Sequence, residues 1–396
     1  MRKTLASTAI AAIIALVLAC FARADDQPGP SDEAVSLARQ LSDAVRREDA
    51  AAVEDLLDTD ALFNRLSAGV KASAGFQAGF RRTFPAHVHE ITGAIVKAGS
   101  DYHLLRVRQV NGEWYILFRV LQKGGGMNYH DWIAAKDQQG NLKLQDVYVA
   151  ISGELISQSM HRVYVQGALA ANPGLLDRLS GKDKELAANL KSMAGIAQDW
   201  KKAQYQQVLN DYKAFPASLQ EDKNYMVLRL LAAEKLLKQS PQEYSAAMAD
   251  YKRLFPADPS VDLDCMDALF ETKEFADARQ SIDRLETFTG GDPYLLVLRG
   301  NTYKLEGGND NLLLAKQSYQ KALEEEPGLA KAYWALVSLS LETQHYDETA
   351  ALLTQIRQKL HIKINDLTKL PTYAGFVKSD AYKKWIANQT ADTPAQ

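Results

Sequence analysis

The sequence is poor in cysteine, which excludes a fold built on disulfide bonds. Only Cys20 and Cys265 occur among its 396 residues. Removal of an N-terminal export signal would leave Cys265 as the one remaining thiol, so the mature chain could form no internal disulfide. The fold must therefore be held by the packing of apolar side chains, which make up 46% of the residues.

Long apolar runs are also missing beyond the N-terminus. The single long run covers residues 5–18, follows Arg2 and Lys3, and precedes a small-residue site that ends at Ala24. This layout is typical of a secretory signal peptide, so we expect residues 1–24 to be removed and the protein to be exported. No other stretch is apolar for about 18 residues, and no transmembrane span is expected.

A second interpretation of the N-terminus stays open. The sequence from Val17 to Cys20 loosely resembles a lipobox, in which Cys20 would be lipidated and become the new N-terminus. Leu18 stands where a small residue is preferred, so we favour ordinary cleavage after Ala24. The alternative is a lipoprotein anchored through Cys20.

An excess of basic charge is absent, and so is a phosphate-binding loop. Loss of residues 1–24 removes three basic residues and no acidic one, which takes the net charge from -3 to -6. This balance argues against nucleic acid as a partner. The glycines at 124–126 lack the Lys-Ser/Thr pair that follows a P-loop. We expect no cofactor.

Residues 32–165 predict an α+β domain. Apolar residues recur at helical spacing over 32–82, and a period of two begins at Tyr102. Asn111-Gly112 is a strong signal for a two-residue hairpin turn. A weaker strand is predicted near 91–97. Helices followed by an antiparallel meander predict helices that cover one face of a curved sheet. The four strongest predicted strands are 102–110, 113–123, 127–136 and 142–152.

Residues 174–388 predict an all-α segment with internal repeats. A small residue recurs at intervals of 31 to 39 residues, with larger apolar residues three before, four after and seven after it. These offsets place all four on one helix face. The repeated small positions are Val208, Ala247, Ala278, Ala315 and Thr349. The pattern resembles the tetratricopeptide repeat, whose period is about 34 residues.

The resemblance implies about five helix pairs that form a solenoid with an extended concave surface. The aromatic-rich segment 370–385 resembles a C-terminal cap of this repeat class, and 389–396 is expected to be a disordered tail. Arg299, Asn301 and Lys304 fall on a first helix of a repeat, which lines the concave surface in this family. They are candidates to bind a peptide carboxylate, and the alternative is an ordinary solvated surface.

Polar residues gather in the predicted sheet. Strand alternation puts Tyr129 and Asp131 on one face and His130 on the other. A buried pair of Arg119 with Asp131 or Asp146 is expected. One interpretation is a ligand pocket with His130 or Asp146 as a general base. The other, which we favour, is a structural network. The candidate pocket residues are Arg106, Arg119, Tyr129, His130, Asp131 and Asp146.

The segments 125–130, 146–148 and 152–157 carry a second resemblance. They are similar to bacterial exported proteins that join a nuclear-transport-factor-2-like domain to tetratricopeptide repeats. The resemblance implies a cone-shaped α+β fold and a periplasmic location, without an activity. No nucleophile motif supports catalysis, and no catalytic residue is assigned.

His87 and His89 could present two imidazoles from one strand face, with His103 or Glu90 as a third ligand. Metal sites need three or four converging ligands, so no metal is expected. The sequence therefore favours an exported, non-catalytic scaffold that binds a protein or peptide on its helical repeats. The alternative is a small-molecule or enzymatic pocket in the sheet domain, with the repeats recruiting partners.

Overall fold

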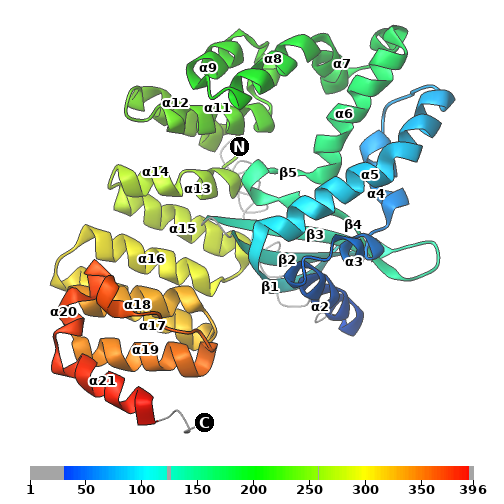
Figure 1. Cartoon of the computed structure of the whole chain (residues 1–396). Helices are drawn as coiled ribbons and strands as arrows, with labels where there is room; N and C mark the ends of the chain where they lie inside the picture. Colours follow the sequence, from blue (N-terminus) through cyan, green and yellow to red (C-terminus); the bar gives the residue numbers. More distant parts are fainter. Residues whose placement is uncertain (1–30, 123–125, 257, 392–396) are drawn as a thin grey trace, which may run out of the picture. The chain divides into compact units, whose positions relative to one another are not determined.

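A computed structural model describes residues 31–122, 126–256 and 258–391 (Figure 1). The predicted signal peptide, with Cys20 and Ala24, lies outside the described residues. The chain divides into two compact units, residues 1–233 and residues 234–396. An N-terminal helical region leads into a five-stranded antiparallel sheet, and helices make up most of the chain that follows.

The sheet of the first unit is a simple meander. Its strands pair in chain order, each antiparallel to the next. Asn111 and Gly112 both have positive φ, at 51° and 87°, as the predicted hairpin turn requires. The four predicted strands are confirmed, except that the fourth, predicted over 142–152, ends at Val149. Ala150–Ser152 form a 3-10 turn instead, and a short fifth strand follows it. The strands are β1 Gly99–Val110, β2 Glu113–Gln122, β3 Met127–Lys136, β4 Leu142–Val149 and β5 Glu154–Leu155.

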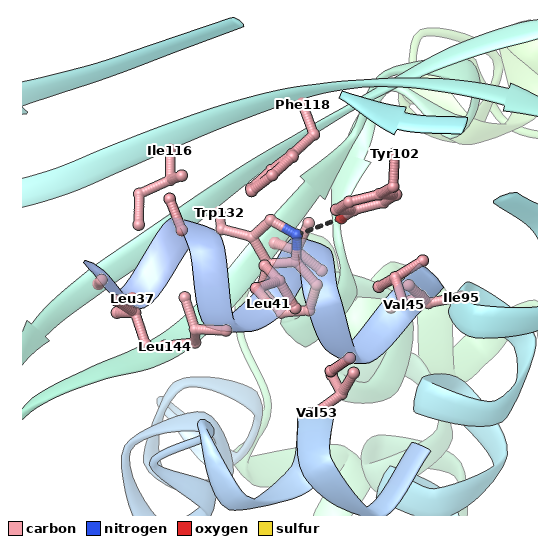
Figure 2. Close-up of a cluster of buried hydrophobic side chains, with 14 of the residues drawn as sticks. Leu37, Leu41, Val45, Val53, Ile95, Tyr102, Ile116, Phe118, Trp132 and Leu144 are labelled. Atoms are coloured by element: carbon pink, nitrogen blue, oxygen red, sulfur yellow. Dashed lines mark hydrogen bonds between the residues drawn. The ribbon is translucent and has the colours of Figure 1, made fainter. Parts of the chain in front are cut away.

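Helices cover one face of this sheet. The apolar side chains between the helices and the sheet form a hydrophobic core (Figure 2). Leu37, Leu41 and Val45 recur at helical spacing along α2 and belong to the same buried cluster as Phe118 and Trp132 of the sheet. Ser31 caps α2, because its side chain accepts a hydrogen bond from the Ala34 amide. The covering helices are α2 Asp32–Arg46, α3 Ala50–Asp55, α4 Thr59–Ser67 and α5 Ala74–Ala98.

The weaker strand predicted at 91–97 is wrong, because these residues belong to α5. Phe84, Val88 and Ile95 are buried at helical spacing and pack this helix onto the rest of the unit. Pro85 lies inside α5. A proline normally interrupts a helix, which is why the sequence pattern here was misleading.

The first unit continues through α6 into a series of shorter helices. Tyr164 of α6 is fully buried against Phe63 of α4 and Phe76 and Phe80 of α5. These helices are α6 Ile156–Ala171, α7 Gly181–Ala188, α8 Leu190–Lys201, α9 Tyr205–Ala214, α10 Ala217–Gln220 and α11 Lys223–Lys235. The boundary between the two compact units, at 233/234, therefore falls within α11.

The second unit consists of helices in pairs. Two pairs, α16 with α17 and α18 with α19, run antiparallel and stack (Figure 1). A short insertion at Gly307 and Gly308, both with positive φ, joins α16 to α17. The helices are α12 Pro241–Leu254, α13 Ser260–Asp264, α14 Met266–Glu271, α15 Phe275–Thr289, α16 Pro293–Glu306, α17 Asn309–Glu325, α18 Ala330–Glu342, α19 Tyr346–Leu360, α20 Ala374–Val377 and α21 Asp380–Ala391.

The repeated small positions are buried throughout. The prediction that they share a buried helix face is confirmed, since each is at most 2% exposed. The residues four positions later are also buried. At the C-terminal end, Phe376 is fully buried beside Tyr346, Tyr382 and Trp385. The small positions are Val208, Ala247, Ala278, Ala315 and Thr349, and the later ones are Tyr212, Tyr251, Ile282, Tyr319 and Leu353.

Helix α21 extends to Ala391, three residues beyond the predicted end of the cap at 388. The rest of the predicted tail, 392–396, lies outside the described residues. Among the described residues, no helix is long and apolar enough to cross a membrane.

Candidate functional site

The predicted polar cluster divides between the two faces of the sheet. The strand register aligns Arg106 with Leu117 and Leu117 with Asp131, which puts Arg106 and Asp131 on one face. Arg119 and Tyr129 are direct partners on that same face, and both are fully buried. His130 points to the other face, as strand alternation predicted.

Asp131 forms its ion pair with Arg108. The two nitrogens Nη1 and Nη2 donate to the two carboxylate oxygens at 3.2 and 2.5 Å. The same guanidinium lies 4.9 Å from the centre of the Tyr115 ring. Burial raises the pKa of Asp131, and the Arg108 hydrogen bonds partly offset that rise. This geometry is that of a buried structural pair.

The expected pair of Arg119 with Asp131 or Asp146 is wrong. Arg119 Nη2 lies 3.0 Å from Asp101 Oδ2 instead. The reason is the register of β1, which is shifted between Leu104 and Arg106 by a bulge. No single sequence pattern specifies such a shift, because it depends on pairing between strands.

His130 belongs to a buried hydrogen-bond network in the core. Its Nδ1 lies 3.1 Å from the Tyr102 hydroxyl, and Trp132 Nε1 donates to that hydroxyl at 2.5 Å (Figure 2 shows the Trp132–Tyr102 bond). Asn128 Oδ1 accepts the backbone amides of Tyr129 and Ile151, so its Nδ2 faces His130 Nε2 at 3.3 Å. The imidazole is therefore neutral with its proton on Nδ1, since Nε2 must accept.

Burial lowers the pKa of His130 to about 4. A general base that works near neutral pH needs a pKa close to the working pH and access to substrate. His130 is only 5% exposed, and its two ring nitrogens both have protein partners. The imidazole is therefore part of the buried core and has little access to solvent.

Asp146 organises the start of α6. Its Oδ1 accepts the backbone amides of Val147 and Ser157 at 2.9 and 3.1 Å. Its Oδ2 is buried without a hydrogen-bond partner, and burial raises the pKa of this carboxyl. Asp146 lines an otherwise mostly apolar cavity of about 20 Å³ that also touches Thr92 and Trp132. That volume holds about one water molecule.

The histidines considered as metal ligands lie on a helix. His87 and His89 belong to α5, so the expectation that they share a strand face is wrong. His89 Nδ1 lies 2.8 Å from Glu54 Oε1, and His87 Nδ1 lies 3.8 Å from Glu90 Oε2. In the described part of the chain, no three His, Cys, Asp or Glu side chains converge as a metal site would require.

Cys265 is fully buried in the second unit, at the junction of α13 and α14. Burial raises the pKa of its thiol to about 12. A thiol of that kind is protonated at neutral pH and is a poor nucleophile.

The candidate peptide-binding residues of α16 have partners on three neighbouring helices. Arg299 Nη2 lies 2.6 Å from Asp283 Oδ1 and 3.2 Å from Glu286 Oε2, both on α15. The Tyr319 hydroxyl of α17 donates to Asn301 Oδ1 at 2.9 Å. Lys304 Nζ donates to Ser338 of α18 at 2.7 Å. All three join helices of the stack, and their role in binding a peptide stays a prediction.

A groove in the second unit was not predicted from the sequence. Its volume is about 300 Å³, and it lies between the beginning of α17, the end of α18 and the beginning of α19. The residues that line it are Asn309, Leu312, Leu313, Lys316, Leu336, Leu339, Ser340, Thr343, His345 and Glu348.

One residue that lines this groove, Leu313, belongs to a set of exposed leucines on α16 and α17. Leu313 and Leu314 of α17 are 56% and 40% exposed, and Leu305 on the last turn of α16 is 59% exposed. A sequence signal for them exists. Three consecutive leucines at 312–314 cannot all face the core, because successive residues of a helix point about 100° apart.

Comparison with known proteins does not identify a family for this chain. No family model matches the chain, and no curated protein matches it. The crystal structure of PilW, described as a widely conserved type IV pilus biogenesis factor, is similar over 53% of this chain and 95% of that chain, with 11% identity and a TM-score of 0.36. Yeast Tom70 is similar over 60% of this chain and 54% of that chain, with 15% identity and a TM-score of 0.35. At these values the similarity assigns neither a family nor a function.

Proposed function

We propose that the protein is an exported, non-catalytic scaffold whose C-terminal helix pairs bind another protein. We take the C-terminal helix pairs to form a solenoid of tetratricopeptide type. Such solenoids present extended surfaces that bind other proteins. The observation that carries the proposal is the groove at α17–α19, in which the side chain of Leu313 is 56% exposed. Apolar surface that is rimmed by polar residues marks interaction sites on soluble proteins.

The sheet domain is proposed to have the nuclear-transport-factor-2-like fold and a structural role. Helices fill the face that would form a pocket, and the cavity that remains beside Asp146 holds about one water molecule. The alternative, a small-molecule or enzymatic pocket, keeps one supporting observation. Asp146 Oδ2 is buried without a partner at that cavity. A ligand would have to open the packing of α5 against the sheet.

Export to the periplasm is part of the proposal and rests on residues 1–24. Intact mass of the purified mature protein separates the two processing routes. A chain that begins at Asp25 supports ordinary cleavage. A chain that begins at a lipidated Cys20 would make the protein a membrane-anchored scaffold instead.

The binding role is tested with the full-length chain as immobilised bait. Leu313→Asp places a charge in the groove, and Leu370→Asp is the matched control, because Leu370 is also exposed, at 43%, and lies outside the groove. We expect a reproducible partner that the wild type and the Leu370→Asp variant retain and the Leu313→Asp variant loses. A partner that all three proteins retain equally would count against this surface.

A further inference from the structure

The groove at α17–α19 is shaped as a trough between two helices. The residues that α17 contributes, at positions 309, 312, 313 and 316, are spaced so that they form one helix face. Those from α18 and its C-cap residue Thr343, at 336, 339, 340 and 343, have the same spacing. A groove between two helix surfaces of this kind is a common binding site for a third, amphipathic helix.

Most of the polar side chains that line the trough already have partners. Lys316 Nζ lies 2.8 Å from Glu348 Oε2. Ser340 Oγ donates to Val337 O or shares a hydrogen bond with Thr349, and Thr343 Oγ1 donates to Leu339 O at 2.9 Å. A ligand therefore gains mainly from covering Leu313 and the exposed part of Leu312, since Leu336 and Leu339 of α18 are only 4% exposed. This favours an apolar side-chain ridge over a polar small molecule.

Carboxylates surround the same end of the helix pairs. Three of them are paired: Glu306 with Arg279 at 2.7 Å, Glu342 with Lys304 at 3.3 Å, and Glu348 with Lys316 at 2.8 Å. Asp310 and Asp347, each exposed next to a residue that lines the groove, have no ion-pair partner in the described part of the chain. Both carboxylates lie in the first turn of a helix, α17 or α19, whose N-terminal end offsets part of their charge. The rim of the groove at this end still carries an excess of acidic side chains.

We infer that the groove binds a basic amphipathic helix of a partner protein. Apolar side chains at positions i, i+3 and i+4 of that helix lie in the trough, and flanking Lys or Arg residues face Asp310 and Asp347. Complementary charge sets specificity and encounter rate, while burial of the leucines supplies most of the affinity. The same negative rim disfavours acidic helices and anionic lipid surfaces. This inference rests on the proposed function and specifies its partner.

The test uses three fluorescein-labelled peptides of equal length and the full-length chain, read by fluorescence anisotropy. The first peptide has leucine at positions i, i+3, i+4 and i+7 of a helix, and every charged residue in it is lysine. The second replaces those lysines by glutamate, and the third scrambles the first so that its helical periodicity is lost. We expect the first peptide to bind about tenfold or more tightly than either of the others.

Variants of the chain test whether the first peptide binds in the groove. Leu313→Asp should weaken the first peptide about tenfold, and Leu370→Asp should leave its affinity unchanged. The double variant Asp310→Asn/Asp347→Asn should weaken the lysine peptide and reduce the salt dependence of its binding. Equal binding of the lysine and glutamate peptides, or binding that Leu313→Asp does not affect, overturns the inference.

Two further outcomes separate the inference from the proposed function. Leu313-dependent binding to vesicles of phosphatidylcholine and phosphatidylglycerol, without peptide binding, would replace the protein partner by a membrane and overturn both. A Leu313-dependent protein partner in the bait experiment, together with no binding of the lysine peptide, would overturn only the basic amphipathic helix. The proposed scaffold role would then stand.

Discussion

The ring of Tyr319 lies where a side chain on Gly300 would begin. A Cβ atom added to Gly300 would come within 2.3 Å of Tyr319 Cε1. Helix α16 can therefore approach α17 this closely only with glycine at that position. The Tyr319 hydroxyl, bonded to Asn301, holds the ring in place.

Gly300→Ala should destabilise the second unit by about 1–3 kcal/mol, because the helices must separate or Tyr319 must leave its position. Thermal unfolding followed by circular dichroism measures the effect. Gly93→Ala in α5 is the control, since nothing lies within 4 Å of an added Cβ there and alanine favours a helix. In a Tyr319→Leu background the cost of Gly300→Ala should shrink. An unchanged cost would mean that Tyr319 is not the obstacle.

His130 should make stability depend on pH between about 6.5 and 4. Burial lowers its folded-state pKa to about 4, whereas the unfolded chain takes up the proton near 6.5. The unfolded state then binds more protons in this window, so stability falls as the pH falls through it, by about 3 kcal/mol in total. Urea unfolding of the wild type and of His130→Gln at several pH values tests this. The difference between the two proteins should shrink toward pH 4, and parallel curves would contradict the assignment.

The parts of the fold that depend on local sequence could be predicted. Alternation and the Asn111-Gly112 turn predicted four strands, because both signals lie within a few residues. The partner of Arg119 could not be predicted, because it depends on a bulge in β1 between Leu104 and Arg106 that puts Asp101 on the same face as Arg119. The helical conformation of His87 was missed because Pro85 is normally a helix breaker.

The exposed leucines also show which features the sequence alone could not predict. The run at 312–314 guarantees that at least one leucine points away from the core, but only the arrangement of α17 and α18 shows that Leu313 lines a groove. The sequence thus predicted which positions are buried in the repeats better than which surface is available for binding.

Removal of one partner of the Arg108–Asp131 ion pair should destabilise the protein strongly. Replacement of both partners by apolar residues should change the free energy of unfolding much less. Arg108→Ala leaves a carboxylate that is 7% exposed without its bidentate partner, at a cost of about 3–5 kcal/mol. The double variant Arg108→Met/Asp131→Leu should recover most of this loss. Arg46→Ala on α2, which breaks an exposed pair with Asp43, should change the free energy of unfolding by less than about 0.5 kcal/mol. Equal losses in the single and double variants would argue for a role of Arg108 beyond this pair.

Asp264 should be destabilising at neutral pH, so Asp264→Asn should stabilise the second unit. Its Oδ2 is buried without a hydrogen-bond partner. Burial raises its pKa well above the usual value, and the neighbouring carboxylates of Glu234 and Asp258 raise it further. The folded state therefore holds this proton more tightly than the unfolded state, and wild-type stability falls as the pH rises above about 4. The advantage of Asp264→Asn should grow over the same range, as measured by urea unfolding. The exposed Asp267→Asn should change stability by less than about 0.5 kcal/mol, and an Asp264→Asn variant no more stable than this control would show that the carboxylate is compensated in the folded protein.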